Sequence, residues 1–269
     1  MTLPRKQLDE LTQQCVEIAE RAGEEILHVY NTGFEVTHKE DSSPLTQADI
    51  AAHQIISQGL STLEPEMPIL SEESSPPDYS VRSTWSRYWL VDPLDGTREF
   101  VKRNGEFTVN IALIEEHEPI LGVVHAPVGG ETWYGSRNNG AWIKQGNENP
   151  RRIQARSPQT DEAWVIIRSR SHPSDRLQTY LDKVGPHETL SLGSSLKTCL
   201  IAEGKADFYP RLGPTSEWDT AAAHCVLREA GGDITDTEMN PLKYNTKESL
   251  LNPEFFAFGR DNPDWSRYL

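Results

Sequence analysis

One acidic segment, WLVDPLDGTR at residues 89–98, constrains the fold of this chain more than any other. The apolar run Tyr88–Val91 before it predicts a short buried strand. Two carboxylates, Asp92 and Asp95, follow at once, and Gly96 then indicates a turn into a helix. Proteins of the α/β class place their binding sites at the carboxyl ends of strands. The segment therefore predicts a site with two acidic groups at the edge of a sheet.

The length and charge of the chain narrow the classes of protein that it can belong to. With 269 residues, of which 36% are hydrophobic, it can form one large domain or two closely packed ones. Its formal net charge of −15 argues against a general nucleic-acid binder, which usually has a basic face. A small anionic substrate remains compatible with this charge, because bound cations can invert its sign locally.

The cysteines indicate a reducing compartment, and the hydropathy pattern indicates neither a signal peptide nor a membrane span. Cys15, Cys199 and Cys225 are scattered and lack CxxC spacing, so we predict small core residues and neither a disulfide framework nor a zinc site. Residues 1–14 lack the apolar segment of a signal peptide, and no run approaches the roughly 20 apolar residues of a membrane span. We therefore expect a cytoplasmic protein without an integral membrane segment.

The first half of the chain predicts two helices followed by a largely antiparallel meander. Apolar residues recur at steps of three and four between Leu8 and Val29, and a second helix opens at Thr46. Residues 68–73 indicate a brief strand that runs into acidic residues, and the proline-containing stretch 74–84 predicts a flexible surface loop. Further strands are expected at residues 107–114, 120–125 and 132–134.

A polar stretch at residues 146–150 predicts a domain boundary. The domain of residues 1–150 is expected to bind metal and phosphate, and residues 151–269 to form a C-terminal α/β domain that completes the site. In this second half, strands and helices are expected to alternate at residues 164–167, 174–184, 189–192, 195–203, 207–209, 218–230 and 255–258. The pattern favours a layered α/β sandwich over a regular doubly wound sheet.

Besides the Asp92/Asp95 pair, three acidic residues lie at the ends of predicted elements: Asp49, Glu72 and Asp219. Each also has a purely structural explanation. Asp49 can complete a capping box with Thr46, and Glu72 can be an ordinary loop acid. Asp219 lies in the first turn of its predicted helix, where the helix dipole favours any acidic residue. Together, however, the carboxylates form a set that a hard cation such as Mg²⁺ prefers. A predicted helix start beside them offers N–H groups to a phosphate, which suits metal-assisted transfer of a phosphoryl group to water.

Three segments resemble the signature segments of the inositol monophosphatase superfamily, in the same order: SEE at residues 71–73, DPLDGT at 92–97 and WDTAA at 218–222. The resemblance implies an αβαβα sandwich of the inositol monophosphatase and fructose-1,6-bisphosphatase type. It also implies a Mg²⁺-dependent, lithium-sensitive phosphatase.

Four further segments resemble the CysQ-type 3′(2′),5′-bisphosphate nucleotidases within that superfamily. They are FVKRNGEFTVN at residues 100–110, SRSH at 169–172, GSSLK at 193–197 and ESLLNP at 248–253. This narrower resemblance implies removal of the 3′-phosphate of adenosine 3′,5′-bisphosphate to give AMP and phosphate, a step of sulfur metabolism.

The roles of individual residues follow from this resemblance alone. Two or three Mg²⁺ ions would be held by Glu72, Asp92, the Leu94 carbonyl, Asp95 and Asp219. Asp49 and Thr97 would orient and deprotonate the attacking water, and Glu72 and Asp95 complete the catalytic set. The implied substrate-binding residues are Glu72, Leu94, Asp95, Gly96, Thr97, Ser169, His172, Gly193, Lys197 and Asp219.

Alternatives remain open for the substrate and for catalysis. The same chemistry would serve an inositol-phosphate or sugar-phosphate monoesterase, and a protein of another class, a non-catalytic metal- or nucleotide-binding regulator, could retain the scaffold. His172 can be an ordinary loop residue, and Lys197 can be a solvated lysine. We expect a small-molecule substrate, no nucleic-acid partner and a monomer or homodimer. A peripheral location on the inner membrane face is implied by the resemblance only.

Overall fold

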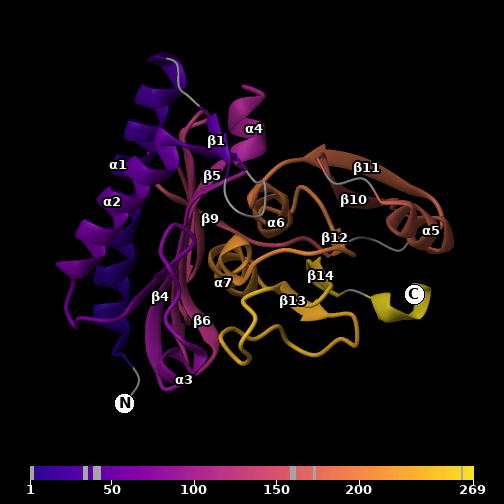
Figure 1. The fold of residues 1–269 in the computed structure, drawn as a ribbon. Helices are drawn as coiled ribbons and strands as arrows, with labels where there is room; N and C mark the ends of the chain where they lie inside the picture. Colours follow the sequence, from indigo (N-terminus) through magenta and orange to yellow (C-terminus); the bar gives the residue numbers. More distant parts are fainter. Residues whose placement is uncertain (1–2, 33–35, 39–43, 158–161, 172–173, 262) are drawn as a thin grey trace.

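The computed structural model describes residues 3–32, 36–38, 44–157, 162–171, 174–261 and 263–269, which form five stacked layers (Figure 1). A helix pair covers a seven-stranded sheet, a second helix pair lies between that sheet and a five-stranded sheet, and a further helix covers the outer face of the latter. The predicted αβαβα sandwich is therefore confirmed.

Two long helices form the first layer. The apolar face of α1 (Arg5–Thr32) packs on strands β5, β6 and β7, as its periodicity predicts. Helix α2 (Gln47–Ser61) packs on α1 and β4, and it begins at Thr46, which closes a capping box with Asp49. The burial of one apolar face on each helix attaches this layer to the sheet.

The seven-stranded sheet has the order β3-β4-β5-β6-β7-β8-β9. Its strands are β3 (Ile69–Ser71), β4 (Arg87–Asp95), β5 (Thr108–Glu115), β6 (Glu118–Ala126), β7 (Glu131–Ser136), β8 (Gly140–Gln145) and β9 (Arg151–Ile153). Only β3 and β4 pair in parallel, so the predicted meander is confirmed. Because β9 lies beyond residue 150 and still pairs with β8, this sheet continues past the predicted domain boundary, and the division into two domains stays a prediction.

The five-stranded sheet has the order β11-β10-β12-β14-β13. Its strands are β10 (Trp164–Ser169), β11 (His187–Leu192), β12 (Phe208–Arg211), β13 (Asp233–Asp236) and β14 (Phe255–Phe258). Helices α6 (Leu196–Ala202) and α7 (Ala221–Glu229) lie between the sheets, whereas α5 (Asp175–Val184) and the 3₁₀ helix η2 (Trp265–Tyr268) cover the outer face. The sequence did not predict β13, which is short and begins and ends with an aspartate.

The prediction of a flexible loop at residues 74–84 is wrong for its second half. A short helix, α3 (Tyr79–Arg82), lies there, and its Arg82 is only 2% exposed. The guanidinium of Arg82 donates to the Asn245 side chain and to the main-chain carbonyls of Lys247 and Glu248. A partner more than 160 residues away explains the burial, and local sequence patterns carry no signal of it.

Two boundaries near the acidic segments also differ from the expectation. Strand β4 continues past Val91 to Asp95, with an irregular register against β5 between Asp92 and Asp95. Such an irregularity accommodates a proline, which cannot donate to the sheet. The helix expected at residues 218–230 is divided into a 3₁₀ turn, η1 (Glu217–Asp219), and α7.

The three cysteines are buried and unpaired, as predicted. None of the helices in the described ranges combines the length and the apolar character that crossing a bilayer requires.

Candidate active site

A cleft of about 300 Å³ lies where the end of β4 and the start of α4 (Thr97–Val101) meet α6, β12 and η1. The sequence-predicted residues that line it are Glu72, Asp92, Leu94, Asp95, Gly96, Thr97, Ser169, Gly193, Lys197 and Asp219. Asp49 lies behind this surface and reaches it through Thr97, whereas His172 is outside the described residues. The cleft thus collects residues from both halves of the chain.

Three carboxylates converge in this cleft. Oxygen atoms of Asp92, Asp95 and Asp219 all lie within 4.8 Å of one another, close enough to share a metal ion. The irregularity at the end of β4 brings the first two together, and the Leu94 N–H donates to Asp92 Oδ1 at 3.0 Å. Asp219 comes from η1, where its Oδ2 accepts from the Ser216 N–H at 2.9 Å. Oxygen ligands at this spacing suit a hard divalent cation.

The electrostatics of the cluster favour a cation as well. Burial raises the pKa of Asp92 well above its usual range, and the nearby carboxylates of Glu72 and Asp95 raise it further. Burial also raises the pKa values of Asp95 and Asp219, the latter again with help from neighbouring carboxylates. Neighbouring carboxylates repel one another when they are ionised, and a bound divalent cation would remove this repulsion.

These raised pKa values predict how pH and a divalent cation affect stability. Between about pH 4 and the raised pKa values, the unfolded chain loses protons that the folded carboxylates keep. The free energy of unfolding of the metal-free protein should therefore fall as pH rises through this window. A divalent cation replaces those protons, so we expect 5 mM Mg²⁺ to raise the melting temperature by about 5 °C at pH 7.5 and by much less at pH 5. Scanning calorimetry with EDTA or with Mg²⁺ measures this difference, and an equal shift at both pH values would contradict it.

A second polar pair lies beside the carboxylates. The Thr97 hydroxyl donates to Asp49 Oδ1 at 3.2 Å and lies 3.3 Å from the Leu94 carbonyl. The other oxygen of Asp49 accepts from the Thr46 N–H and hydroxyl at 2.8 and 2.7 Å. The capping box and the contact with Thr97 therefore exist together, one on each oxygen, and the cap holds the carboxylate in place.

Asp95 is held by residues that the sequence analysis missed. The Ser195 hydroxyl lies 3.0 Å from Asp95 Oδ2 and 2.7 Å from the Asp219 carbonyl, so it connects the two halves of the cluster. Asn110 donates to Ser195 Oγ at 2.9 Å, and its own Oδ1 accepts from the Thr108 hydroxyl at 3.0 Å. Their only signal in the sequence is their position inside the segments that resemble known nucleotidases.

Cationic side chains form another part of the cleft lining. Lys197 is 9% exposed, its ammonium donates to the Ser194 carbonyl, and burial lowers its pKa. Arg211, at the end of β12, was not predicted. It is 8% exposed, donates from Nη2 to the Pro214 carbonyl at 2.7 Å, and has no partner for its Nε among the described residues. Lys197 is thus not the solvated lysine of the alternative interpretation, and two buried cations are available to an anion.

Two glycines permit a close approach of the backbone. Gly96 has φ of 94°, which favours glycine, and a Cβ there would lie 3.0 Å from the Glu106 carbonyl oxygen. A Cβ on Gly193 would lie 2.6 Å from Glu99 Cγ. The Gly193 N–H donates to Glu106 Oε2 at 2.8 Å, so Gly193 lines the cleft with its N–H already engaged within the protein.

Comparisons with known proteins agree with this geometry. Residues 7–260 match the model of the inositol monophosphatase family. The chain is 50% identical over 247 residues to proteins named 3′(2′),5′-bisphosphate nucleotidase CysQ from Salmonella typhimurium and Escherichia coli, an alignment that covers 91% of this chain and 98% of each relative. The crystal structure of CysQ from Bacteroides thetaiotaomicron superposes with a TM-score of 0.82 at 39% identity, over 94% of this chain and 98% of that one.

Proposed function

Because the chain belongs to the inositol monophosphatase family, we propose that its cleft performs the reaction for which its CysQ relatives are named. The enzyme would remove the 3′-phosphate of adenosine 3′,5′-bisphosphate and release AMP and phosphate. It would thus be a phosphoric monoester hydrolase that acts on a small molecule.

One observation carries this proposal. The three clustered carboxylates, the Asp49–Thr97 pair and two buried cations line or adjoin a single cleft. The carboxylates can hold metal, the pair can take a proton, and the cations can hold a phosphate. Each of these is a separate requirement of phosphate hydrolysis by water.

We propose that Asp92, Asp95, Asp219, Glu72 and the Leu94 carbonyl hold two or three Mg²⁺ ions. The donor set fits, because all of these groups offer oxygen and the carboxylates crowd one another when ionised. Bound Mg²⁺ would neutralise these carboxylates and lower the pKa of coordinated water. Lithium sensitivity is an expectation from the family.

The Asp49–Thr97 pair is proposed to orient the attacking water. Since the Thr97 hydroxyl donates its proton to Asp49, its lone pairs can accept a hydrogen bond from water in the cleft. A proton that leaves the water can pass to Thr97 Oγ1 while the hydroxyl proton moves to Asp49. Asp49 is suited to receive it, because its second oxygen is anchored by the cap. No covalent intermediate with the protein is needed.

Residues from both halves of the chain are proposed to bind the substrate. Gly96 and Thr97 N–H groups would contact the scissile phosphate, and Lys197 with Arg211 would neutralise the second phosphate. Ser169, His172 and Gly193 are proposed to lie along the nucleoside. In this arrangement residues 1–150 supply most of the metal site, and residues 151–269 complete it with Asp219.

A substrate panel tests the proposed function. Phosphate release with Mg²⁺ should be far more efficient, by kcat/KM, for adenosine 3′,5′-bisphosphate than for inositol 1-phosphate, and Li⁺ should inhibit it. A preference for inositol or sugar phosphates would favour the alternative within the family. Nucleotide binding with Mg²⁺ but without turnover would identify a non-catalytic regulator.

Replacement of Lys197 tests the assignment of the second phosphate. Lys197→Ala should raise KM for adenosine 3′,5′-bisphosphate about tenfold or more, because a buried charge-assisted contact is lost, and should raise KM for adenosine 3′-monophosphate much less. Lys243 is exposed and does not line the cleft, so Lys243→Ala is a control that should leave both values unchanged. Equal losses for the two substrates would show that Lys197 does not bind the second phosphate.

A further inference from the structure

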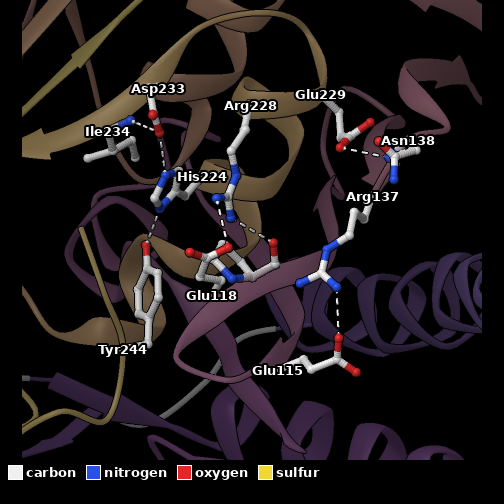
Figure 2. Close-up of polar contacts among 11 residues, drawn as sticks. Glu115, Glu118, Arg137, Asn138, His224, Arg228, Glu229, Asp233, Ile234 and Tyr244 are labelled. Atoms are coloured by element: carbon white, nitrogen blue, oxygen red, sulfur yellow. Dashed lines mark hydrogen bonds and ion pairs between the residues drawn. The ribbon is translucent and has the colours of Figure 1, made fainter. Parts of the chain in front are cut away.

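A chain of polar side chains, buried except at Asp233, leads away from the turn that carries Asp219, on residues that the proposed chemistry does not use. It joins Asp233 on β13, His224 on α7, Tyr244 and Thr220, and the first three of these residues point toward one another in Figure 2. His224 and Tyr244 are 1% and 0% exposed, and Thr220 is 5% exposed. Polar groups buried this deeply cost stability unless they are paired, so their alignment calls for an explanation.

The contacts in this chain are short at one end. His224 Nε2 lies 2.8 Å from Asp233 Oδ1, and its Nδ1 lies 2.8 Å from the Tyr244 hydroxyl. The Tyr244 hydroxyl lies 3.4 Å from Thr220 Oγ1. Ionised Asp233 can only accept, so His224 donates from Nε2. Burial lowers the pKa of His224, so the neutral ring accepts a hydrogen bond from the Tyr244 hydroxyl at Nδ1. The Tyr244 oxygen can then accept a hydrogen bond from the Thr220 hydroxyl.

Tyr244 is also held through its main chain. Its N–H donates to the His117 carbonyl at 3.0 Å, and its own carbonyl lies 2.8 Å from His117 Nδ1. His117 belongs to the turn between β5 and β6 of the seven-stranded sheet, whereas Asp233 belongs to the five-stranded sheet. This series of hydrogen-bonded side chains is therefore anchored in both sheets.

Thr220 is the residue at which these contacts meet the site. Asn252 donates from Nδ2 to Thr220 Oγ1 at 3.1 Å and to the Ser216 carbonyl at 2.7 Å, and the Thr220 hydroxyl lies 3.2 Å from the Glu217 carbonyl. Thr220 directly follows Asp219. The carbonyl of that connecting peptide lies 2.7 Å from the Ser195 hydroxyl on the cleft side. The peptide is thus held from the cleft by Ser195 and from behind by the Thr220 side chain.

We propose that Asp233, His224 and Tyr244 are positioning residues that fix Thr220, and through it the carboxylate of Asp219, in the orientation that binds metal. This inference rests on the proposed function, since it assigns metal binding to Asp219. A carboxylate on a short 3₁₀ turn has several accessible orientations, and a rigid support removes those that point away from the other two carboxylates.

Direct measurement of Mg²⁺ binding by calorimetry tests the proposal without relying on activity. Tyr244→Phe removes only a hydroxyl from the chain. Tyr180→Phe is its matched control, because the Tyr180 hydroxyl is also buried and donates to the Trp265 carbonyl at 2.8 Å, in the outermost layer. We expect Tyr244→Phe to weaken Mg²⁺ binding about tenfold, the size typical of residues that support metal ligands, and Tyr180→Phe to leave it within twofold. Both variants should lower the melting temperature of the metal-free protein to a similar degree.

A second pair of variants addresses Thr220 itself. Thr220→Val keeps the shape and loses the hydroxyl, so it should weaken Mg²⁺ binding at least as much as Tyr244→Phe. Thr220→Ser keeps the hydroxyl and should restore binding to near the wild-type level. If Thr220→Val does not fold, the two tyrosine variants and Thr220→Ser still decide the question.

The outcomes separate the two proposals. If the wild-type protein binds Mg²⁺ and hydrolyses the nucleotide while Tyr244→Phe binds Mg²⁺ as the wild type does, the positioning role is refuted and the proposed function stands. An equal loss of Mg²⁺ affinity in Tyr180→Phe also refutes the positioning role, because the effect would then be one of general stability. A wild-type protein that binds no Mg²⁺ would refute the proposed function and this inference with it.

Discussion

Asp95→Asn is expected to reduce kcat/KM for adenosine 3′,5′-bisphosphate by about 1,000-fold or more. The amide has nearly the same size as the carboxylate, and it can still accept from Ser195 and Asn110. What it lacks is the negative charge that a divalent cation requires from the cluster. Steady-state kinetics over a range of Mg²⁺ concentrations measure the loss, and retention of near-full activity would refute the metal role of Asp95.

The same substitution should make the metal-free protein more stable at neutral pH. Asp95→Asn removes one of three mutually repelling acids of the cleft, so the melting temperature in EDTA should rise while the stabilisation by Mg²⁺ shrinks. Asp236→Asn is a suitable control, because Asp236 also accepts main-chain hydrogen bonds and does not line the cleft. It should change neither activity nor the response to Mg²⁺. Loss of stability together with loss of activity in Asp95→Asn would instead indicate a misfolded site.

Thr97→Val is expected to lower kcat by roughly 100- to 1,000-fold, within the range found for the loss of proton transfer in catalysis. Valine keeps the volume and branching of threonine but removes the hydroxyl that connects the cleft to Asp49. Mg²⁺ affinity should change little, since Thr97 is not among the proposed metal ligands. Thr97→Ser retains the hydroxyl and should recover most of the activity. Equal activity in the serine and valine variants would contradict the proposed role.

The partner of Thr97 offers an independent test of the pair. Asp49→Asn should lower kcat to a similar degree, and it should cost only about 1 kcal/mol of stability, because asparagine can still accept at the cap. If Thr97 and Asp49 act as one proton-accepting unit, the double variant should be no slower than the poorer single variant. Additive losses would mean that the two residues act separately.

Both sheets contribute to this site, which explains the position of the cleft. Asp92 and Asp95 extend from β4 of the seven-stranded sheet, whereas Arg211 ends β12 of the five-stranded sheet. Asp219 lies on the turn before α7, the helix that packs against both sheets. A change in the relative position of the two sheets would therefore alter the metal cluster and the anion-binding side chains together.

The sequence alone determined the layered α/β class, the main helices and the acidic residues of the cleft. These features carry local signals. The periodicity of α1, the capping box at Thr46 and the aspartates at the end of β4 follow from hydrogen bonds and apolar faces within a few residues of one another. The resemblance to known signature segments added the order in which the acids occur and the chemistry that they serve.

Only the tertiary structure decided which distant residues support those acids. Arg82 is buried by Asn245, Ser195 connects Asp95 with Asp219, Arg211 enters the cleft, and Tyr244 links His224 to Thr220. None of these contacts has a repeating pattern or a fixed spacing, because each depends on how the layers pack. A buried polar group is satisfied by whichever partner the fold brings within about 3 Å, and that partner can lie anywhere in the chain.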